Sequence, residues 1–499
     1  MSIPLLLSVF IIASCGLVYE LVAGALSSYL LGDSVTQFST IIGVYLFAMG
    51  VGSWLSRYIE NGLIARFIQI ELMVGVLGGF SAALLFLVFA WIGESFRLVL
   101  YSVVLLTGIL VGLEIPLVMR ILKQHYALKD LVSQVLTFDY LGALVVSLAF
   151  PLLLAPHLGL IRTSLMFGLL NALVALWAIW LFRERLARAG WLATQGGLVV
   201  VLLLGGLVGA ERLTRMAEES LYSDEIIYTE TTSYQRIVLT RWKNDIRLFL
   251  NGNLQFSSRD EYRYHEALVH PALQAVKRPR QVLVLGGGDG LAIREILKYP
   301  DIEQITLVDL DPGMTRLFSS LPMLRELNQD ALHSPKLKLV NDDAFLWLDK
   351  TQGFYDFIVV DFPDPTNFSL GKLYSKTFYH LLSQHLSQNG LAVIQSTSPL
   401  YARKSFWTIA HTIQSAGLQV SPYHALVPSF GEWGFLIASH QPYVKPDRFD
   451  SPLKFVTPDL MPVLFQFPAD MSETTTDINR LDNQALVHTY ESEWRQHEP

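Results

Sequence analysis

The amino-acid sequence predicts two parts of different fold class: an α-helical transmembrane bundle over residues 1–214, followed by an α/β region built on a doubly wound sheet. Three observations support this prediction. Long apolar runs fill the chain before residue 215. After that residue, apolar side chains recur at the shorter period of strands. From residue 281 onward, apolar strands alternate with helical stretches, which is the pattern of a parallel sheet.

Length and charge exclude several classes of protein. The chain has 499 residues, of which 52% are hydrophobic and 16% are charged. It is therefore too long for one ordinary domain and too apolar for a typical soluble protein. The formal net charge of −7 leaves no basic excess to neutralise phosphates, so nucleic acid is not expected as a partner. A single cysteine, Cys15, cannot form an internal disulfide.

The first part contains about seven apolar segments, most of which reach the roughly 20 residues that a bilayer requires. They are Ile3–Leu31, Phe38–Tyr58, Phe67–Gly93, Phe96–Ile121, Leu131–Ala155, Ile161–Phe182 and Trp191–Ala210. Helices of soluble proteins keep a polar face, and these segments have none. The sequence therefore predicts a multi-pass domain of about seven helices, with the lipid bilayer of the cell (inner) membrane as its partner.

The orientation of this domain follows less simply from charge. Basic residues gather after the second, fourth and sixth segments, and the positive-inside rule puts those loops in the cytoplasm. Strict alternation of seven spans would place everything after residue 215 outside, whereas the chemistry predicted for the second part favours the cytoplasm. We therefore expect the first segment, which Glu20 interrupts, to be a broken or re-entrant span.

Four acidic residues lie inside or at the ends of the apolar segments: Glu20, Glu71, Glu114 and Asp139. A charged side chain costs about 2.5–3.5 kcal/mol at mid-membrane on insertion scales. Two interpretations stay open, a functional role and a hydrogen-bonding role between helices or near loops. Because no Lys or Arg lies near Glu20 in sequence, a passing organic cation is one hypothesis for its partner.

The second part divides into three regions. Short strands and an Asn251-Gly252 turn predict a small β subdomain over residues 215–275. Residues 276–450 predict a Rossmann-like domain, because strands such as Val282–Leu285 and Ile305–Val308 are separated by helical stretches. Further strands are expected at Leu337–Val340, Phe357–Val360 and Leu391–Ile394. The tail, residues 451–499, contains no motif that predicts a role.

A glycine cluster, Gly286-Gly-Gly-Asp-Gly290, follows the first strand of the Rossmann-like domain. The dinucleotide fingerprint is incomplete, because Leu291 takes the place of its last glycine and Asp289 would repel a pyrophosphate. Asp309, at the end of the next strand, suits a ribose diol. These residues predict a nucleoside without phosphates, of the S-adenosylmethionine type. Asp289 favours a donor that ends in a bare ammonium, as decarboxylated S-adenosylmethionine does, although it could instead cap the following helix.

Two more acids, Asp361 and Asp364, directly follow the strand Phe357–Val360. Carboxyl ends of parallel strands are where doubly wound sheets bind ligands. No His or Cys follows at ligand spacing, so no metal is expected, and an Asp-Pro turn is the structural alternative. Five carboxylates fall at strand ends on one predicted rim, which predicts a pocket for a cationic substrate: Asp289, Asp309, Asp343, Asp361 and Asp364.

Several motifs in order resemble those of the spermidine synthases, the polyamine aminopropyltransferases. The resemblance extends over roughly residues 220–440, and the apolar first part looks like the extra N-terminal region of the membrane-bound branch of that family. The motifs are Asn251-Gly-Asn-Leu-Gln255, Asp260-Glu261, Tyr264-His265-Glu266, His270, Gly286-Gly-Gly-Asp-Gly290, Asp342-Asp343-Ala344-Phe345, Asp361-x-x-Asp364-Pro365, Gln395 and Gly434-Phe435.

The resemblance implies an aminopropyltransferase that moves the aminopropyl group of decarboxylated S-adenosylmethionine to putrescine, giving spermidine and methylthioadenosine without a metal or redox cofactor. It implies that Asp364 accepts the proton and that Tyr264 orients the amine. The methylthioadenosine part would be held by Gln255, Asp309, Asp343 and Ala344, and the polyamine side by His265, Asp289, Asp361 and Gln395. Taken singly, Tyr264 and His265 could be core or helix-surface residues, Gln255 a strand-edge polar group and Gln395 a satisfied buried amide.

Two departures from the family pattern leave the acceptor amine open. Thr366–Lys372 replaces a glycine-rich segment of the soluble relatives, and Phe430 stands where they have a polyamine-contacting tyrosine. Two other classes of function also stay open: a methyltransferase that uses intact S-adenosylmethionine, and a non-catalytic polyamine transporter or sensor. Soluble relatives commonly self-associate, so the resemblance makes a homo-oligomer a candidate state.

Overall fold

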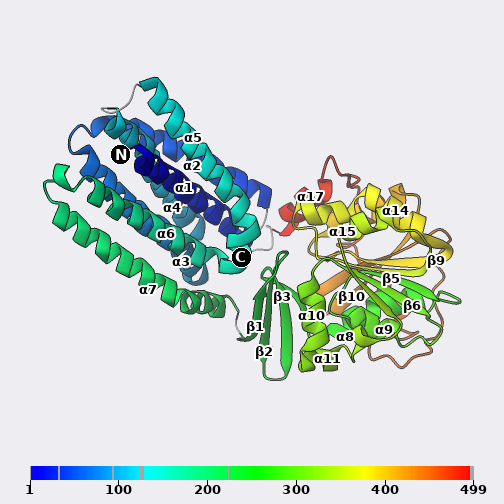
Figure 1. Cartoon of the computed structure of the whole chain (residues 1–499). Helices are drawn as coiled ribbons and strands as arrows, with labels where there is room; N and C mark the ends of the chain where they lie inside the picture. The colour runs from blue at the N-terminus through cyan, green and yellow to red at the C-terminus, as the bar shows by residue number, and fades with distance from the viewer. Residues whose placement is uncertain (1, 32–33, 93–94, 124–127, 223, 495–499) are drawn as a thin grey trace. The chain divides into compact units, whose positions relative to one another are not determined.

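The computed structural model describes residues 2–31, 34–92, 95–123, 128–222 and 224–494 (Figure 1). The chain divides into two compact units, Met1–Ile226 and Ile227–Pro499, and each is described by itself.

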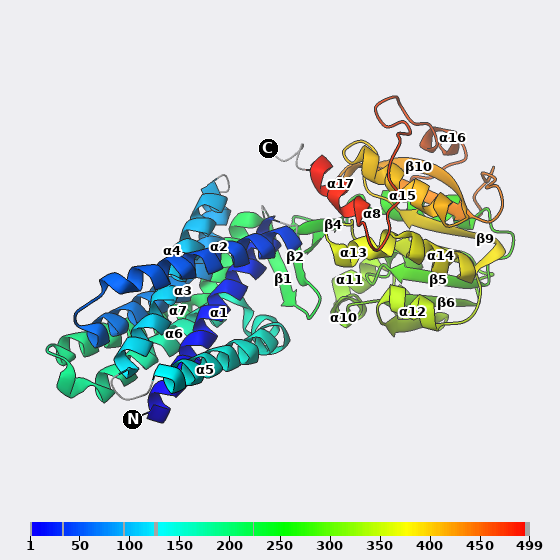
Figure 2. The same cartoon turned by 90° about the horizontal axis from the view of Figure 1, so that it is seen from above.

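Within the described residues, seven long α-helices build the first unit (Figure 2). A π-helical turn, Phe150–Leu154, separates the fifth and sixth helices, and Gly159 interrupts the sixth with a φ of +74° and a ψ of 169°. The helices are α1 (Ser2–Leu31), α2 (Ser34–Leu55), α3 (Leu63–Ile92), α4 (Phe96–Leu122), α5 (Leu128–Ala149), α6 (Ala155–Leu181) and α7 (Ala189–Leu221).

Helix α1 is the inner helix of this unit, because it packs against α2, α3, α4, α5 and α6. Its side chains Cys15, Val18 and Val22 are fully buried. The prediction of a broken first span is wrong, since α1 runs without interruption from Ser2 to Leu31. Glu20 is only half-buried, so its carboxylate can be accommodated at the side of a regular helix.

Six helical runs of the described chain are long and apolar enough to cross a membrane. The fifth run, Lys129–Leu181, has 53 residues and includes both α5 and α6. The outer surface of the unit is strongly apolar, with Val208 88% exposed and Leu98 74% exposed. An apolar surface of this kind is compatible with a membrane protein.

A four-stranded sheet begins the second unit, in the order β1-β2-β3-β4. Its strands are β1 (Glu225–Thr231), β2 (Arg236–Trp242), β3 (Asp245–Leu250) and β4 (Asn253–Ser257). Asn251 and Gly252 connect β3 to β4 with φ values of 50° and 84°, which is the backbone that a tight hairpin needs. Because the hairpin returns at once, it supplies a fourth strand that the sequence analysis did not predict.

A seven-stranded sheet forms the rest of the second unit, in the order β10-β11-β9-β8-β5-β6-β7. The five strands from β9 to β7 are parallel, and β10 and β11 pair antiparallel at one edge. The strands are β5 (Gln281–Gly286), β6 (Gln304–Asp309), β7 (Leu337–Asn341), β8 (Tyr355–Asp361), β9 (Leu386–Gln395), β10 (Gln419–Val427) and β11 (Gly431–Ser439). This is the predicted Rossmann-like architecture.

Helices cover both faces of the large sheet (Figure 1), because successive strand residues point to opposite sides. Val282 and Val284 pack into one apolar core, and Leu283 and Leu285 pack into the other. The covering helices include α8 (Glu261–Leu273), α9 (Leu291–Ile296), α10 (Pro312–Ser320), α11 (Pro322–Leu327), α12 (Ala344–Lys350), α13 (Phe368–Gly371), α14 (Lys376–His385) and α15 (Arg403–Ser415).

The tail after residue 450 packs onto the same unit. Val456, Met461 and Leu464 belong to the first core, and Leu486 belongs to the second. Two short helices lie in the tail, α16 (Met461–Leu464) and α17 (Ala485–Trp494). Helix α17 packs against α15, which brings the end of the described chain close to the carboxyl end of the sheet.

Candidate active site

The glycine turn between β5 and α9 lies directly against the end of β8. Gly286 has a φ of +80°, and a Cβ atom there would lie 2.2 Å from the carbonyl oxygen of Asp361. Only glycine combines this backbone conformation with so close an approach. The turn therefore places Asp289 next to Asp361, and their carboxyl groups influence one another electrostatically.

Asp289 is half-buried and accepts a hydrogen bond of 2.9 Å from the backbone N–H of Leu291, at the start of α9. One carboxylate oxygen of Asp289 therefore caps α9, which is the structural alternative given for this residue. Burial raises the pKa of Asp289, and the nearby Glu261 carboxylate raises it further, although His265 and Arg294 act in the opposite direction. A group of this kind becomes more acidic when a cation approaches it.

Asp309 stands at the end of β6, on the same rim of the sheet. Its carboxylate accepts hydrogen bonds from the backbone N–H groups of Gly288 at 3.0 Å and Asp311 at 2.8 Å. Burial, with the charges of Asp311 and Asp289, raises its pKa to about 6. The geometry brings Asp289, Asp309 and Asp361 together around one turn, and these are three of the five carboxylates that the sequence predicted on one rim.

Tyr264 on α8 donates a hydrogen bond of 2.5 Å to Oδ1 of Asp361. Its ring packs against Phe435 and Phe430, with ring centroids 5.4 and 6.2 Å away. Burial and the neighbouring Asp289 raise the pKa of Asp361 to about 6, while His265 and Tyr264 counteract part of the rise. The two candidate residues are therefore in direct contact, with an aromatic wall beside them.

Asp364 lies three residues beyond the end of β8 and is surrounded by neutral donors. Oδ2 accepts hydrogen bonds from Tyr490 at 2.8 Å and Thr397 at 3.0 Å, and Oδ1 accepts one from Gln395 at 3.4 Å. Burial raises the pKa of Asp364 in spite of these hydrogen bonds. A half-buried carboxylate without a cationic partner among the described residues is suited to accept a proton.

Gln395 is 2% exposed at the end of β9, and its amide is fully engaged. Nε2 donates to the carbonyl oxygen of Phe362 and to the hydroxyl of Tyr374. Oε1 accepts from the N–H of Thr397 and from the indole of Trp433, each at 3.2 Å. Gln395 is therefore a buried amide whose hydrogen bonds are all made within the protein, which is the structural alternative given for it. Its hydrogen bonds fix the segment that includes Asp364.

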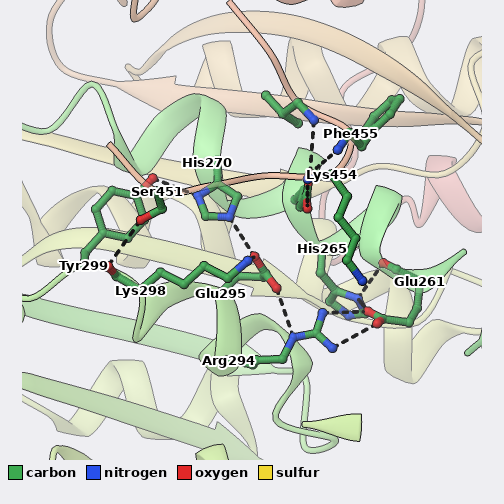
Figure 3. Close-up of polar contacts among 12 residues, drawn as sticks. Glu261, His265, His270, Arg294, Glu295, Lys298, Tyr299, Ser451, Lys454 and Phe455 are labelled. Carbon is green, nitrogen blue, oxygen red and sulfur yellow. Dashed lines mark hydrogen bonds and ion pairs between the residues drawn. The ribbon is translucent and has the colours of Figure 1, made fainter. Parts of the chain in front are cut away.

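His265 is held by an ion-pair network between α8 and α9 (Figure 3). Its Nδ1 lies 2.8 Å from Oε2 of Glu261, and Arg294 binds both oxygens of Glu261 at 2.9 Å. Arg294 also pairs with Glu295, whose other oxygen bonds His270. The network fixes the orientation of the His265 ring.

The charges of the network also set the protonation of its members. Burial alone would lower the pKa of His265, but Glu261, Asp289 and Asp361 together raise it. Burial would raise the pKa of Glu261, but His265 and Arg294 lower it to about 2. The pKa of His265 is therefore raised by the carboxyl groups that surround it.

Two of the residues expected to hold the donor have local partners of their own. Asp343 caps α12 by accepting a hydrogen bond of 2.9 Å from the N–H of Phe345, and its Oδ2 pairs with Nζ of Lys372 at 2.5 Å. Lys372 and the cap lower its pKa, although burial opposes them. Ala344 is buried at the start of α12. Gln255 is half-buried on β4 and donates to the carbonyl oxygen of Asn253, in its own strand.

Sequence reasoning missed three residues around Asp364. Thr397 follows β9 with a φ of 53°, Tyr374 is fully buried, and Tyr490 is 9% exposed on α17. None of the three belongs to a motif that was recognised, and Tyr490 lies in the tail that carried no motif. Lys372 was noted only as part of a departure from the family pattern.

Comparisons with known proteins identify the family of the chain. The family model of the spermine/spermidine synthase domain matches residues 261–448. Polyamine aminopropyltransferase 2 of Ralstonia nicotianae is 56% identical over 498 residues, covering 98% of each chain. The polyamine aminopropyltransferase of Leptospira interrogans is 54% identical over 494 residues, covering 99% of each chain. A solved spermidine synthase in complex with the transition state analogue AdoDATO is 22% identical, with a TM-score of 0.46, and the match covers 49% of this chain and 86% of that one.

The identity to the two bacterial relatives extends over both units, so the helical region is part of what the chain shares with them. Their names do not support the methyltransferase or the non-catalytic alternatives. The chain belongs to the spermidine synthase family, the polyamine aminopropyltransferases, and is an aminopropyltransferase.

Proposed function

We propose that this enzyme transfers the aminopropyl group of decarboxylated S-adenosylmethionine to putrescine, giving spermidine and methylthioadenosine. The observation that supports this most strongly is the group of half-buried carboxyl groups of Asp289, Asp361 and Asp364, which have no Lys or Arg in ion pairs among the described residues. Two cationic substrates would supply the missing positive charge. The donor ends in an ammonium, and a diamine carries another at each end.

The chemistry is a displacement at the carbon next to the sulfonium. The amine nitrogen forms a bond to that carbon, the carbon–sulfur bond breaks, and its electron pair neutralises the sulfonium in methylthioadenosine. The leaving group needs no acid. The attacking amine has a pKa near 10, so its deprotonation at pH 7 costs about 4 kcal/mol, at roughly 1.4 kcal/mol per pKa unit.

We assign the proton to Asp364. Burial raises the pKa of Asp364, so this pKa lies closer to the pKa of the amine than the pKa of an exposed aspartate does. Tyr490, Thr397 and Gln395 fix the position of the Asp364 carboxylate. Tyr264 and Asp361 would orient the amine beside it, since Tyr264 donates to Asp361 and packs on Phe435. Asp289 and His265 would contact amine groups, and Asp309, Asp343, Ala344 and Gln255 would hold the nucleoside. Alignment of the two substrates supplies much of the remaining acceleration.

The acceptor assignment is tested by rate comparison. The purified enzyme is given the same donor with putrescine, with the longer diamine cadaverine or with spermidine, and kcat/KM is measured for each. We expect putrescine to be preferred by at least tenfold, because the ion pairs at both ends of a diamine depend on its length. A higher kcat/KM for spermidine would contradict the assignment and identify a longer product.

We further propose that α1–α7 lie in the cell (inner) membrane and that the second unit faces the cytoplasm. With α1 unbroken, seven full spans and the positive-inside rule give the opposite side, so the chemistry of the donor and not the loop charge carries this orientation. The apolar outer surface and the length of the helices support the first statement. A charged nucleoside donor does not cross a bilayer unaided, which supports the second. The test is protease treatment of sealed right-side-out and inside-out vesicles. Cleavage of the second unit only in inside-out vesicles is expected, and cleavage only in right-side-out vesicles would contradict it.

A further inference from the structure

The core of the helical unit contains polar groups that the aminopropyl transfer does not use. Glu71 on α3 is fully buried and Glu114 on α4 is 1% exposed. Neither oxygen of Glu71 has a hydrogen-bond partner within the described chain, and the same is true of Oε1 of Glu114. The ion pairs of the described residues include no Lys or Arg beside either carboxyl group.

The two carboxyl groups come from α3 and α4, which pack against each other, and they interact electrostatically. Glu71 makes no hydrogen bond, so the pair does not share a proton through a direct bond. Two carboxyl groups in this arrangement repel each other when both are charged. A cation between them would remove both the repulsion and the cost of burying unpaired charge.

Tyr19 on α1 packs against the face of α3 that carries Glu71. It is 3% exposed, its hydroxyl has no hydrogen-bond partner within the described residues, and it interacts electrostatically with both Glu114 and Glu71. Its ring packs on α3, since a Cβ atom at Gly78 would lie within 2.7 Å of three ring atoms. Gly78 and Glu71 are seven residues apart and therefore share a face of α3.

Asn171 on α6 adds an amide to the cluster. It is fully buried, and neither its oxygen nor its nitrogen has a partner within the described residues. A Cβ atom at Gly75, one turn after Glu71 on α3, would lie 3.5 Å from Cβ of Asn171. Unpartnered buried amides and hydroxyls are costly, and several together indicate a site that is complete only with a ligand.

We propose that these four residues form a second amine-binding site, in which Glu71 and Glu114 hold the ammonium end of an alkyl diamine. The ammonium has three N–H donors, and the carboxylates and the amide oxygen of Asn171 offer matching acceptors. The hydroxyl oxygen of Tyr19 would accept a further hydrogen bond from the ammonium. An ammonium suits the cluster because it is compact and its methylene chain can pack among the apolar side chains of the bundle.

The site differs from the catalytic one, because all four residues belong to the first unit and the catalytic residues belong to the second. Its existence does not depend on the proposed acceptor amine. It does require that the helical unit be studied in a bilayer or a mimic of one. Spermidine formation, measured on the same samples, reports on the second unit alone.

The experiment is equilibrium binding of radiolabelled putrescine to the full chain in lipid nanodiscs. The test variant is Glu71→Gln with Glu114→Gln, which keeps the shape of both side chains and removes their charge. The matched control is Glu60→Gln with Glu184→Gln, which neutralises two exposed glutamates of the same unit. The wild type and the control should bind one putrescine more per chain than the test variant does. Equal stoichiometry in all three would overturn the proposal.

Two further measurements, putrescine binding by Tyr19→Phe and binding of radiolabelled Na⁺, test the site independently of the double Gln variant. Tyr19→Phe retains every charge and should weaken putrescine binding at this site by five- to tenfold, so unchanged affinity would contradict the role of the hydroxyl. If the Gln variant does not unfold cooperatively, the Tyr19→Phe result decides alone. Radiolabelled Na⁺ is the competing probe. Loss of Na⁺ binding with unchanged putrescine binding in the Gln variant would show a metal-ion site and refute an amine site.

Discussion

Tyr490 donates a hydrogen bond of 2.8 Å to Oδ2 of Asp364, although the two residues are 126 positions apart in the chain. The contact joins α17, in the tail, to the segment after β8. Helix α17 is further anchored by Glu493, whose carboxylate accepts from the backbone N–H groups of Lys404 and Ser405 at the start of α15. The tail therefore contributes directly to the environment of the proposed proton acceptor.

Replacement of Asp364 tests that role. Asp364→Asn should lower kcat by 10²- to 10⁴-fold, the usual contribution of a general base, while the dissociation constant of the donor changes little. Asp349→Asn, an exposed acid on α12, is the control and should keep normal turnover. Steady-state or stopped-flow kinetics measure kcat, and a separate binding experiment measures the dissociation constant of the donor. Near-normal turnover in Asp364→Asn would refute the assignment.

Removal of the Tyr490 hydroxyl tests its influence on the acceptor. The hydrogen bond lowers the pKa of Asp364, so Tyr490→Phe should raise that pKa further and shift the acid limb of the kcat profile to higher pH. We expect kcat at pH 7 to fall by about threefold to tenfold, as for the loss of one ordinary hydrogen bond of about 0.5–1.5 kcal/mol. KM for both substrates should change less than kcat. A lower kcat with an unshifted pH profile would indicate only a structural role.

Asp361 and Asp309 predict how donor and amine binding depends on pH. Both have pKa values raised to about 6, so their protonated forms dominate below that pH and cannot pair with a cation. Binding of putrescine, which Asp361 would orient, should therefore strengthen as pH rises from 5 to 7, and binding of the donor should do so through Asp309. Titration calorimetry of the wild type and of Asp361→Asn measures this. The variant should show a weaker pH dependence, and an identical dependence would contradict the assignment.

The raised pKa values of Asp361 and Asp309 also affect stability: they make the unliganded protein less stable as pH rises. A carboxyl group whose pKa is raised on folding contributes stability below its unfolded pKa, and that contribution is lost as pH rises through the folded value. A rise from 3.8 to about 6 corresponds to about 3 kcal/mol for each group at 1.36 kcal/mol per unit. Asp361→Asn should therefore raise the Tm of the unliganded enzyme at pH 8 but not at pH 4.5. A lower Tm at pH 8 would contradict this explanation.

The network of Glu261, Arg294 and His265 predicts a stability effect with its own pH dependence. Glu261→Gln leaves Arg294 buried with fewer partners, and removal of one partner of a buried ion pair typically costs 3–5 kcal/mol. Because Glu261 also raises the pKa of His265, the loss should be greater below pH 6.5 than above the folded pKa of the histidine. Thermal unfolding at pH 6 and pH 9 measures both effects.

Glu303→Gln is the matched control for this experiment, since Glu303 pairs with Arg280 on the surface, where the two side chains are 57% and 61% exposed. Exposed pairs contribute about 0–1 kcal/mol, so its Tm should hardly move. An equal loss in both variants would show that the buried network has no special role.

Much of the fold could be predicted from local sequence patterns. The apolar runs predicted the seven long helices, and the strand, glycine turn and helix after residue 281 predicted the β5–α9 unit. The antiparallel strands β10 and β11 were not predicted, although the motif Gly434-Phe435 lies in β11 and the two strands form a hairpin in which Val427 pairs with Gly431. The prediction that Glu20 breaks the first helix was also wrong, since the sequence does not show that the carboxylate lies at the side of α1.

The candidate site was predictable only where a motif lies at a strand end. Asp289, Asp309 and Asp361 come together because parallel strands carry their carboxyl ends to one rim. Asp343 could not be recognised as a paired residue, because its partner Lys372 is 29 positions away. Tyr490 could not be found for the same reason. Side-chain partners brought together by tertiary packing leave no local signal.

The most direct test of the central claim is mass spectrometry of the products that the purified full-length enzyme forms from decarboxylated S-adenosylmethionine and putrescine. We predict spermidine and methylthioadenosine in equal amounts, and no methylated amine when intact S-adenosylmethionine replaces the donor. Release of S-adenosylhomocysteine with a methylated amine, or binding of both substrates without any new polyamine, would contradict it.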